Sequence, residues 1–272
     1  MPALFPPLFV DRVPREDRRL LRLRMALRAL ARRLLRGLAP LLAALPVPAA
    51  WAQARVPDPG AVVRQVVERG NEFRRSQGQA PLAPEARLAA AARGFADLLA
   101  DTDRFGHDAD GRSPSQRATA AGYGWCMVAE NLALEGSSAG FESAELAQDL
   151  VDGWIQSPGH RRNLLAADAT QTGVAIAYSP RSDRWYAVQM FGRPASDRIT
   201  FDITNRSTTA VSYRVGDRSW PLTPGMRRTD QTCGATDVEV ALPGQPPLAL
   251  HPRDGTHFRI EAAQGRLRVG GE

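Results

Sequence analysis

Apolar residues in the first part of the chain recur at helical spacing in some segments and alternate with polar residues in others. Helical spacing, with apolar positions three or four residues apart, predicts three amphipathic helices, at 61–77, 88–99 and 146–154. Alternation of apolar and polar residues predicts three strands, at 128–134, 174–178 and 186–190. The last two are expected to form a hairpin around a polar turn. We therefore predict a mixed α+β domain at 58–193, in which helices cover a small antiparallel sheet.

The pattern changes beyond Pro194. Short alternating segments follow one another, separated by breaks rich in Gly, Pro and Asp, at 199–203, 211–215, 238–240, 258–260 and 267–269. A series of short strands with no helical segment between them is typical of a β-sandwich. We predict a small all-β module of the sandwich type at 197–272.

The positive charge of the chain is confined to its N-terminal segment. The 272 residues carry a formal net charge of +6, which by itself would suggest a nucleic-acid or membrane-surface partner. Residues 1–54, however, hold ten arginines and three acidic residues, whereas 55–272 hold 25 basic and 26 acidic residues. Because the body of the protein is close to neutral, we exclude nucleic acid as a partner.

An Arg-rich stretch followed by an uncharged apolar run begins at Met25. The run ends at Ala52-Gln53-Ala54, a small-x-small sequence typical of a signal-peptide cleavage site. We predict a start at Met25, cleavage after Ala54, and a secreted or periplasmic protein that meets a membrane only through this segment. The alternative is a membrane anchor, which is disfavoured by three prolines within the run, Pro40, Pro46 and Pro48.

The chain has two cysteines, Cys126 and Cys233. In an oxidising compartment a disulfide between them would persist and would link the two predicted parts of the chain. Spacing in the sequence does not decide geometry. A disulfide and a pair of buried free thiols therefore both remain open.

Five motifs follow one another in a fixed order in the first part of the chain. They are NEFRRSQGQAPL (71–82), FGHDADGRSPSQRATAAGYG (105–124), AENLA (129–133), WIQSPGHRRNLL (154–165) and RWYAVQMFG (184–192). Together they strongly resemble the bacterial form of the CAP superfamily, the SCP domain of cysteine-rich secretory, antigen-5 and pathogenesis-related-1 proteins. The resemblance covers 58–193, about half of the chain, and implies an α-β-α sandwich.

The resemblance also points to candidate site residues. In the family, a histidine of the first loop, the glutamate of the AEN strand and a histidine after the third helix converge in one cleft, and these positions are His107, Glu130 and His160. Eukaryotic members add a second glutamate, where this chain has Ser157. Two imidazoles and one carboxylate match the ligand count of a catalytic zinc with an open position, so Zn or another divalent cation is one hypothesis. The other is that Glu130 orients the histidines by hydrogen bonds.

Four further residues belong to the motifs. Gln189 alternates with Tyr186, Val188 and Met190, which predicts that it points to the opposite face of the sheet and lines the cleft. The remaining three residues are Asn71, Arg117 and Asn131. They match family positions, and we expect their side chains to form hydrogen bonds with the backbone of loops.

The resemblance supports more than one function. CAP proteins bind lipids, glycans or protein partners in grooves, so the first hypothesis is a secreted module that binds a lipid, a glycan or an envelope protein and is not an enzyme. The second is a metal-dependent hydrolase in which His107, Glu130 and His160 activate a water molecule. A third treats these residues as polar packing in an envelope-maintenance protein. Glu130→Gln would abolish a hydrolase, whereas it would cost a binding module little beyond stability.

Overall fold

The computed structural model of the chain describes residues 55–271. The predicted start at Met25, the signal peptide and its cleavage site lie outside these residues. The helices of the first part are α2 (Pro59–Ser76), α3 (Ala86–Thr102), α4 (Pro114–Ala120), α5 (Ser143–Gln156) and α6 (Pro158–Leu164). Its strands are β1 (Ala83–Pro84), β2 (Trp125–Glu135), β3 (Gln171–Ser179) and β4 (Arg184–Pro194). Among the helices of 55–271, none has the length and apolar character needed to cross a membrane.

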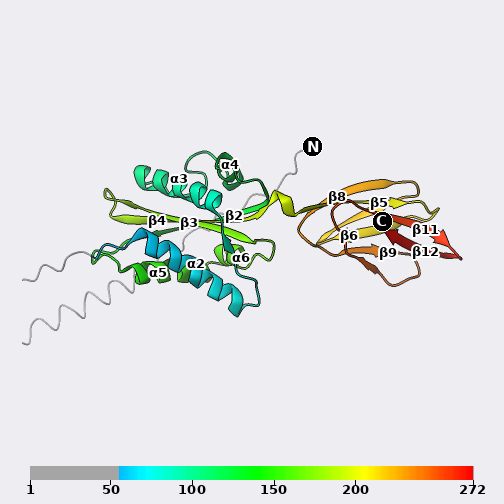
Figure 1. Ribbon diagram of the computed structural model, residues 1–272, viewed down its shortest axis with the longest axis horizontal. Helices are drawn as coiled ribbons and strands as arrows, with labels where there is room; N and C mark the ends of the chain where they lie inside the picture. The colour runs from blue at the N-terminus through cyan, green and yellow to red at the C-terminus, as the bar shows by residue number, and fades with distance from the viewer. Residues whose placement is uncertain (1–54, 272) are drawn as a thin grey trace, which may run out of the picture. The chain divides into compact units, whose positions relative to one another are not determined.

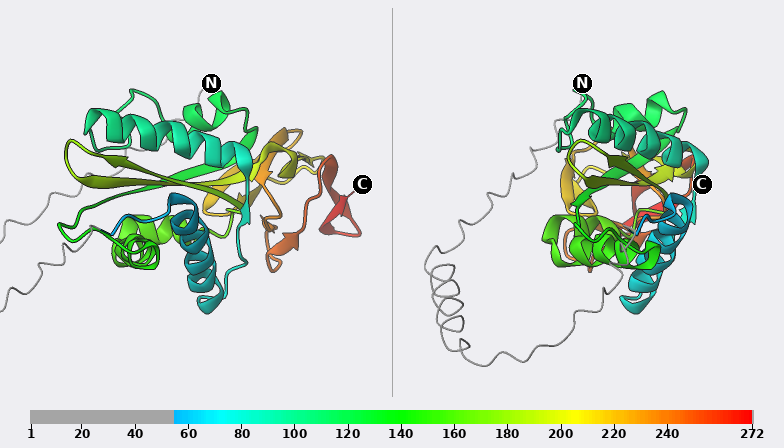
Figure 2. Two further views of the ribbon diagram at one scale, coloured as in Figure 1. Left: turned by 60° about the vertical axis from the view of Figure 1, so that its left-hand side comes forward. Right: turned by 90° about the vertical axis from the view of Figure 1, so that its left-hand side faces the viewer.

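A four-stranded sheet forms the middle layer of this first part. The strand order is β1-β3-β4-β2, with β1 parallel to β3 and the other pairs antiparallel. Helices α3 and α4 lie over one face of the sheet, and α2, α5 and α6 lie over the other (Figure 1, Figure 2). The predicted α-β-α architecture is confirmed, as are the helices that the apolar spacing placed at α2, α3 and α5.

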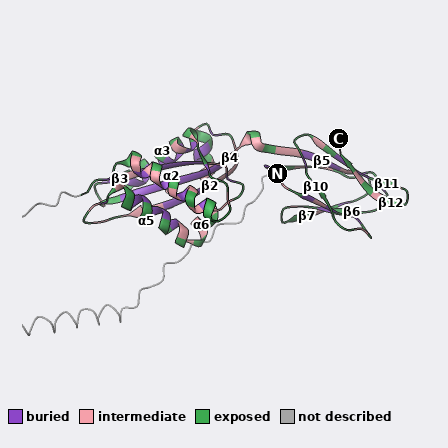
Figure 3. Ribbon diagram, turned by 60° about the horizontal axis from the view of Figure 1, so that its bottom comes forward, coloured by how far each residue is buried: buried purple, intermediate pink, exposed green. Residues whose placement is uncertain are grey.

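Strand β4 supplies side chains to the cores on both faces of the sheet. On one face, Tyr186, Val188 and Met190 pack against α3. On the other face, Trp185, Ala187 and Phe191 pack against α2 and α5. A strand covered on both faces buries every second residue on each side, so the burial of β4 is nearly continuous along its length (Figure 3). The fixed alternation also determines which face each polar residue of the sheet can reach.

Strand β2 is the exposed edge of the sheet, and side chains of the flanking helices cover part of its backbone. The indole N–H of Trp154 donates to the carbonyl oxygen of Leu132 at 2.9 Å, and the side-chain amide of Asn163 donates to the carbonyl oxygen of Glu130 at 3.1 Å. An edge strand with free backbone groups is open to pairing with another chain. These two bonds block such pairing next to Glu130 and fix α5 and α6 against the strand.

The second part of the described chain contains only strands after a short 3-10 turn, η1 (Ala195–Asp197). The strands are β5 (Arg198–Asn205), β6 (Val211–Val215), β7 (Arg218–Leu222), β8 (Arg227–Cys233), β9 (Val238–Ala241), β10 (Leu248–Leu250), β11 (Thr256–Ala263) and β12 (Arg266–Gly271). They form two four-stranded sheets, ordered β10-β9-β6-β7 and β12-β11-β5-β8. Apolar residues of both sheets share one core, which confirms the predicted β-sandwich. The boundaries of independent domains at 58–193 and 197–272 stay a prediction.

Strand β8, with the sequence RRTDQTC, was not among the predicted strands. Its register with β5 pairs Arg228 with Ile203 and Asp230 with Phe201, so polar side chains occupy the positions that face the core. The Arg228 guanidinium lies 4.7 Å from the centre of the Trp220 ring, and Asp230 accepts a hydrogen bond from the buried Tyr213 hydroxyl. Because partners on the opposite sheet replace apolar packing, the strand lacks the alternation by which sequence analysis detects strands.

A disulfide joins Cys126 of β2 to Cys233 of β8, with a Cα–Cα distance of 5.6 Å. The pairing was one of the two alternatives that the sequence left open. Neighbouring contacts bring the two strands together: the backbone N–H of Gly234 donates to the carbonyl of Asp197, and the Arg198 guanidinium donates to the carbonyl of Trp125. The bond therefore links the first sheet of the protein to the β-sandwich.

Candidate functional site

The loop that carries His107 is fixed at both ends by local structure. Helix α3 ends at Asp103, which adopts a left-handed conformation with φ 50° and accepts hydrogen bonds from the hydroxyls of Ser182 and Tyr186. Helix α4 begins after Ser113, whose hydroxyl and backbone exchange hydrogen bonds with Gln116 in a capping box. The loop thereby returns toward the sheet, and α4 lies across β2.

Glu130 lies on β2, directly opposite Met190 of β4, and therefore faces the α3 and α4 side of the sheet. The residue is 4% exposed. Its oxygen Oε1 lies 2.8 Å from Nδ1 of His107, whose side chain is 50% exposed. The structure thus brings together two of the three residues that the motifs suggested, one buried and one at the surface.

Arg117 is the main partner of Glu130. Its Nη2 donates to Oε1 and Oε2 of Glu130 at 2.9 and 3.0 Å, and its Nε donates to Oε2 at 3.2 Å. The remaining donors go to Asp110 at 2.7 Å and to the carbonyl oxygens of Arg112 and His107 at 2.8 and 2.9 Å. The guanidinium also covers the Phe95 ring, 3.6 Å from its centre. Arg117 does bind loop backbones as expected, but sequence analysis missed its pairing with Glu130.

His160 is half-buried on α6, on the other side of strand β2. Asn131 donates from its side-chain amide to the backbone carbonyl of His160 at 3.1 Å and accepts from the Asn163 amide at 2.9 Å. Burial, together with the charge on nearby His107, lowers the pKa of the His160 imidazole. His107 is therefore close enough for its charge to act on His160, and we refer to His107, Arg117, Glu130 and His160 as the histidine cluster.

Two residues from the motifs have structural positions away from this cluster. Gln189 lies opposite Asn131 on the face that α2 and α5 cover, is 2% exposed, and donates to the Thr172 hydroxyl at 3.2 Å. Gln189 lies on the face that alternation predicted, but the prediction that it lines a cleft with Glu130 is wrong, because it is buried and Glu130 points to the other face of the sheet. Asn71 both donates to and accepts from the backbone of Leu82, at 3.0 and 2.7 Å, as expected for a residue that holds a loop.

The histidine cluster does not fit a divalent metal. Within 55–271, no group of three or more His, Cys, Asp or Glu side chains lies close enough together to hold an ion. Both oxygens of Glu130 already accept hydrogen bonds from Arg117, and an ion on this carboxylate would lie against the guanidinium. Since like charges in a buried site repel strongly, the arrangement disfavours the Zn hypothesis of His107, Glu130 and His160 as ligands.

The first part of the described chain is thus a three-layer α-β-α domain in which a histidine pairs with a buried glutamate on the edge strand of the sheet. The model of the cysteine-rich secretory protein family (CAP) matches residues 67–191. This segment of the chain is a CAP domain.

Known proteins are similar to part of this chain. The uncharacterized protein YkwD of Bacillus subtilis (strain 168) is 28% identical over 117 residues, which are 43% of this chain and 42% of that protein. The chain thus spans less than half of the length of this relative. An extracellular protein with an SCP domain from Bacillus anthracis str. Ames has 26% identity and a TM-score of 0.42, covering 50% of this chain and 41% of that one. An outer surface protein from Borrelia burgdorferi has 20% identity and a TM-score of 0.43, covering 49% of this chain and 92% of that one.

Proposed function

We propose that this protein acts outside the cytoplasm as a binding module, whose CAP domain presents His107 to a polar partner, and that it is not a metal-dependent hydrolase. The observation that carries the proposal is the buried pair of Arg117 and Glu130, in which both carboxylate oxygens are occupied. A general base must have a lone pair within reach of the water that it activates. Glu130 instead uses its oxygens to hold Arg117 and His107.

The exposed groups around the pair suit recognition of a partner. The His107 side chain is half exposed, and its Nδ1 is engaged by Glu130, which fixes the ring and leaves the other nitrogen to a ligand. Phe105, two residues earlier, is 51% exposed. An oriented imidazole on the same loop as an exposed aromatic ring favours a polar ligand, a glycan or an envelope protein, over a lipid.

Two features support a location outside the cytoplasm. The sequence of residues 25–54 is typical of a signal peptide, and disulfides such as that between Cys126 and Cys233 persist in oxidising compartments. A fusion of residues 1–60 to a reporter enzyme that is active only after export tests this part of the proposal. We expect reporter activity, and its loss when the arginines at 32 and 33 and the apolar run are removed.

Photo-crosslinking tests the binding role. A photoreactive phenylalanine replaces Phe105, and a matched control places it at Tyr178, which is 42% exposed near the C-terminal end of strand β3. We expect a discrete adduct in cells from position 105, lost on His107→Ala, and none from position 178. Equal labelling from both positions, or no adduct from 105, would refute a partner at the histidine cluster.

Zinc titration by calorimetry tests the hydrolase alternative. We expect no micromolar affinity in the wild-type protein, because Arg117 lies against the carboxylate. Micromolar binding that disappears in the double variant His107→Ala/His160→Ala would overturn the proposal in favour of a metal site.

A further inference from the structure

The β-sandwich has an edge strand that pairs with a neighbour on one side only. Strand β8 stands at the end of the sheet order β12-β11-β5-β8, and its sole partner strand within residues 55–271 is β5 (Figure 1). An edge strand presents a row of backbone N–H and C=O groups with which another strand can pair. The sandwich has no part in the function proposed above, so this edge concerns a separate property of the protein.

The hydrogen bonds of β5 show which residues of β8 point outward. Positions in an antiparallel pair alternate between those that exchange backbone hydrogen bonds and those that do not. The backbone N–H of Asn205 donates to the carbonyl oxygen of Met226, whereas Thr200, which lies opposite Gln231, directs its N–H and C=O to the segment before β11. The residues of β8 whose backbone groups point away from β5 are therefore Arg227, Thr229 and Gln231.

These outward groups are uncovered. Within residues 55–271, no side chain or loop forms a hydrogen bond with the backbone N–H or C=O of the three residues on their outward side. All three residues are exposed. The edge is thus open over five consecutive residues, 227–231.

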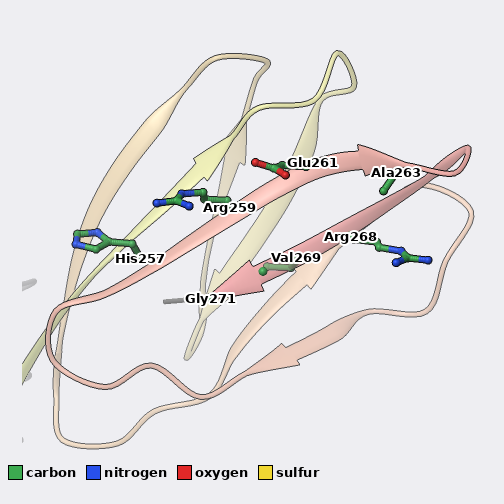
Figure 4. Close-up of a pocket in the computed structure, with 8 residues that line it drawn as sticks. His257, Arg259, Glu261, Ala263, Arg268, Val269 and Gly271 are labelled. Carbon is green, nitrogen blue, oxygen red and sulfur yellow. The ribbon is translucent and has the colours of Figure 1, made fainter.

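The other three edge strands of the sandwich are short, interrupted or covered. Strand β10 has three residues, and β7 contains Pro221, which has no N–H. On β12, the carbonyl oxygen of Leu267 accepts a hydrogen bond from the Gln245 side chain at 3.3 Å. The shallow hollow of about 340 Å³ on β11 and β12 offers no converging charges either, since Arg259 and Arg268 point away from one another (Figure 4). Strand β8 is therefore the edge best suited to pairing.

The charges of β8 complement a second copy of the same strand. In an antiparallel pair centred on Thr229, Arg228 of each copy lies opposite Asp230 of the other. If the centre moves by one residue, Arg228 lies opposite Arg228 or Asp230 opposite Asp230, and like charges directly opposite are destabilising. Because charges that point toward a core also discourage pairing with an arbitrary strand, they favour this one partner in this one register.

Arg228 has capacity for a second carboxylate. Its Nε is buried and has no hydrogen-bond partner among the described residues, although Oδ2 of Asp230 in the same chain lies 3.4 Å away. The side chain as a whole is 37% exposed. Residues 228 and 230 would occupy positions without backbone hydrogen bonds between the copies, where side chains approach most closely. An Asp230 of the second copy would therefore meet this guanidinium.

We propose that two copies of the protein pair through β8, antiparallel and centred on Thr229, so that two four-stranded sheets become one continuous sheet. Thr229 exchanges backbone hydrogen bonds with Thr229 of the other copy, and Arg227 does so with Gln231. Such a contact is isologous, as in most dimers of identical chains. The ladder ends before Cys233 and leaves its disulfide in place. Since only five residues of each strand take part, we expect a reversible dimer.

Size-exclusion chromatography with light scattering tests the proposal on the protein purified after expression with its own N-terminal segment. We expect the mass to rise from one copy toward two as the concentration increases. Gln231→Pro removes one outward N–H from each copy, so the dissociation constant of the dimer should rise about tenfold or more. The matched control is Ser219→Pro on edge strand β7, where Pro221 already occupies the same backbone orientation. It should leave the dissociation constant unchanged.

Two results of this experiment would overturn the proposal. The first is a wild-type protein that stays monomeric at every concentration, as it would if the edge served a strand of another protein. The second is a dimer that both proline variants weaken equally, or that Gln231→Pro leaves intact while its circular dichroism spectrum is unchanged.

Cysteine cross-linking tests the register and does not require the strand to tolerate proline. Thr229→Cys places two thiols opposite one another with a Cα–Cα distance of about 5.5 Å, which suits a disulfide. We expect a 229–229 disulfide under mild oxidation, and none from the matched control Ser212→Cys, an exposed position on β6. Arg227→Cys protein should cross-link to Gln231→Cys protein but not to itself. Absence of the 229–229 disulfide, or equal cross-linking from position 212, would contradict pairing through β8.

Discussion

Removal of the Arg117 guanidinium provides the most direct test of how the histidine cluster is built. The substitution Arg117→Met keeps the length and apolar packing of the side chain over Phe95 but leaves the Glu130 carboxylate without its main partner. Arg117 is 5% exposed and Glu130 is 4% exposed, so water cannot replace the lost bonds without a rearrangement of the loop. Among the described residues, only His107 then remains within hydrogen-bond distance of the carboxylate.

The expected loss is large because the pair is buried. Deletion of one member of a buried ion pair costs about 3–5 kcal/mol, most of it from the uncompensated charge that remains. For a protein of this size, such a loss lowers the melting temperature by about 6–20 °C. Glu130→Gln should cost less, because Arg117 keeps Asp110 at 2.7 Å and two backbone carbonyls.

A double-mutant cycle monitored by thermal and urea unfolding measures these effects. We expect the variant Arg117→Met/Glu130→Gln to be more stable than the sum of the single losses implies, with a coupling of about 1–3 kcal/mol. The matched control is Arg214→Met, because Arg214 pairs with Glu239 at 2.7 Å but both side chains are nearly half exposed. An exposed pair of this kind contributes about 0–1 kcal/mol. If Arg117→Met costs no more than Arg214→Met, or if the losses simply add, the reasoning from burial is refuted.

Three further predictions concern stability. Reduction of the disulfide, or the variant Cys126→Ser/Cys233→Ser, should cost about 2–5 kcal/mol, because the bond closes a loop with a sequence separation of 107 residues; melting curves that coincide with and without reductant would contradict this. The lowered pKa of His160 means that the folded protein binds a proton less readily than the unfolded chain, so its contribution to stability is complete above about pH 6.5 and is lost as the pH falls through the folded pKa. The melting temperature of His160→Gln should therefore fall less between about pH 8 and pH 5 than that of the wild type, and an equal fall in both proteins would contradict the lowered pKa. Gly173→Ala should destabilise the protein by about 3 kcal/mol or more, since a β-carbon would lie 2.1 Å from the backbone nitrogen of Ala89 in α3. Gly153→Ala, in open space on helix α5, should instead stabilise the protein by up to about 1 kcal/mol. Similar melting temperatures for these two variants would show that α3 does not pack against β3 at Gly173.

The sequence by itself determined the elements whose burial follows a simple period. Helices α2, α3 and α5 each bury one face on which apolar residues recur, and alternate residues of β3 and β4 enter the cores on opposite faces of the sheet, so their apolar spacing was visible along the chain. The ordered motifs identified the CAP domain and pointed to His107, Glu130 and His160. Local signals of this kind do not depend on what the rest of the chain contributes.

Only the tertiary structure decided which groups meet. Arg117 reaches Glu130 because α4 folds back across β2, and no spacing in the sequence reports that contact. The strand β8 escaped detection because it places Arg228 and Asp230 at positions that face the core, where Arg228 lies over the Trp220 ring and Asp230 accepts from the Tyr213 hydroxyl. Alternation gave the face of Gln189 but not the helices that bury it. The pairing of Cys126 with Cys233 likewise depends on β8 lying beside β5, since contacts between distant segments are fixed by packing and not by local pattern.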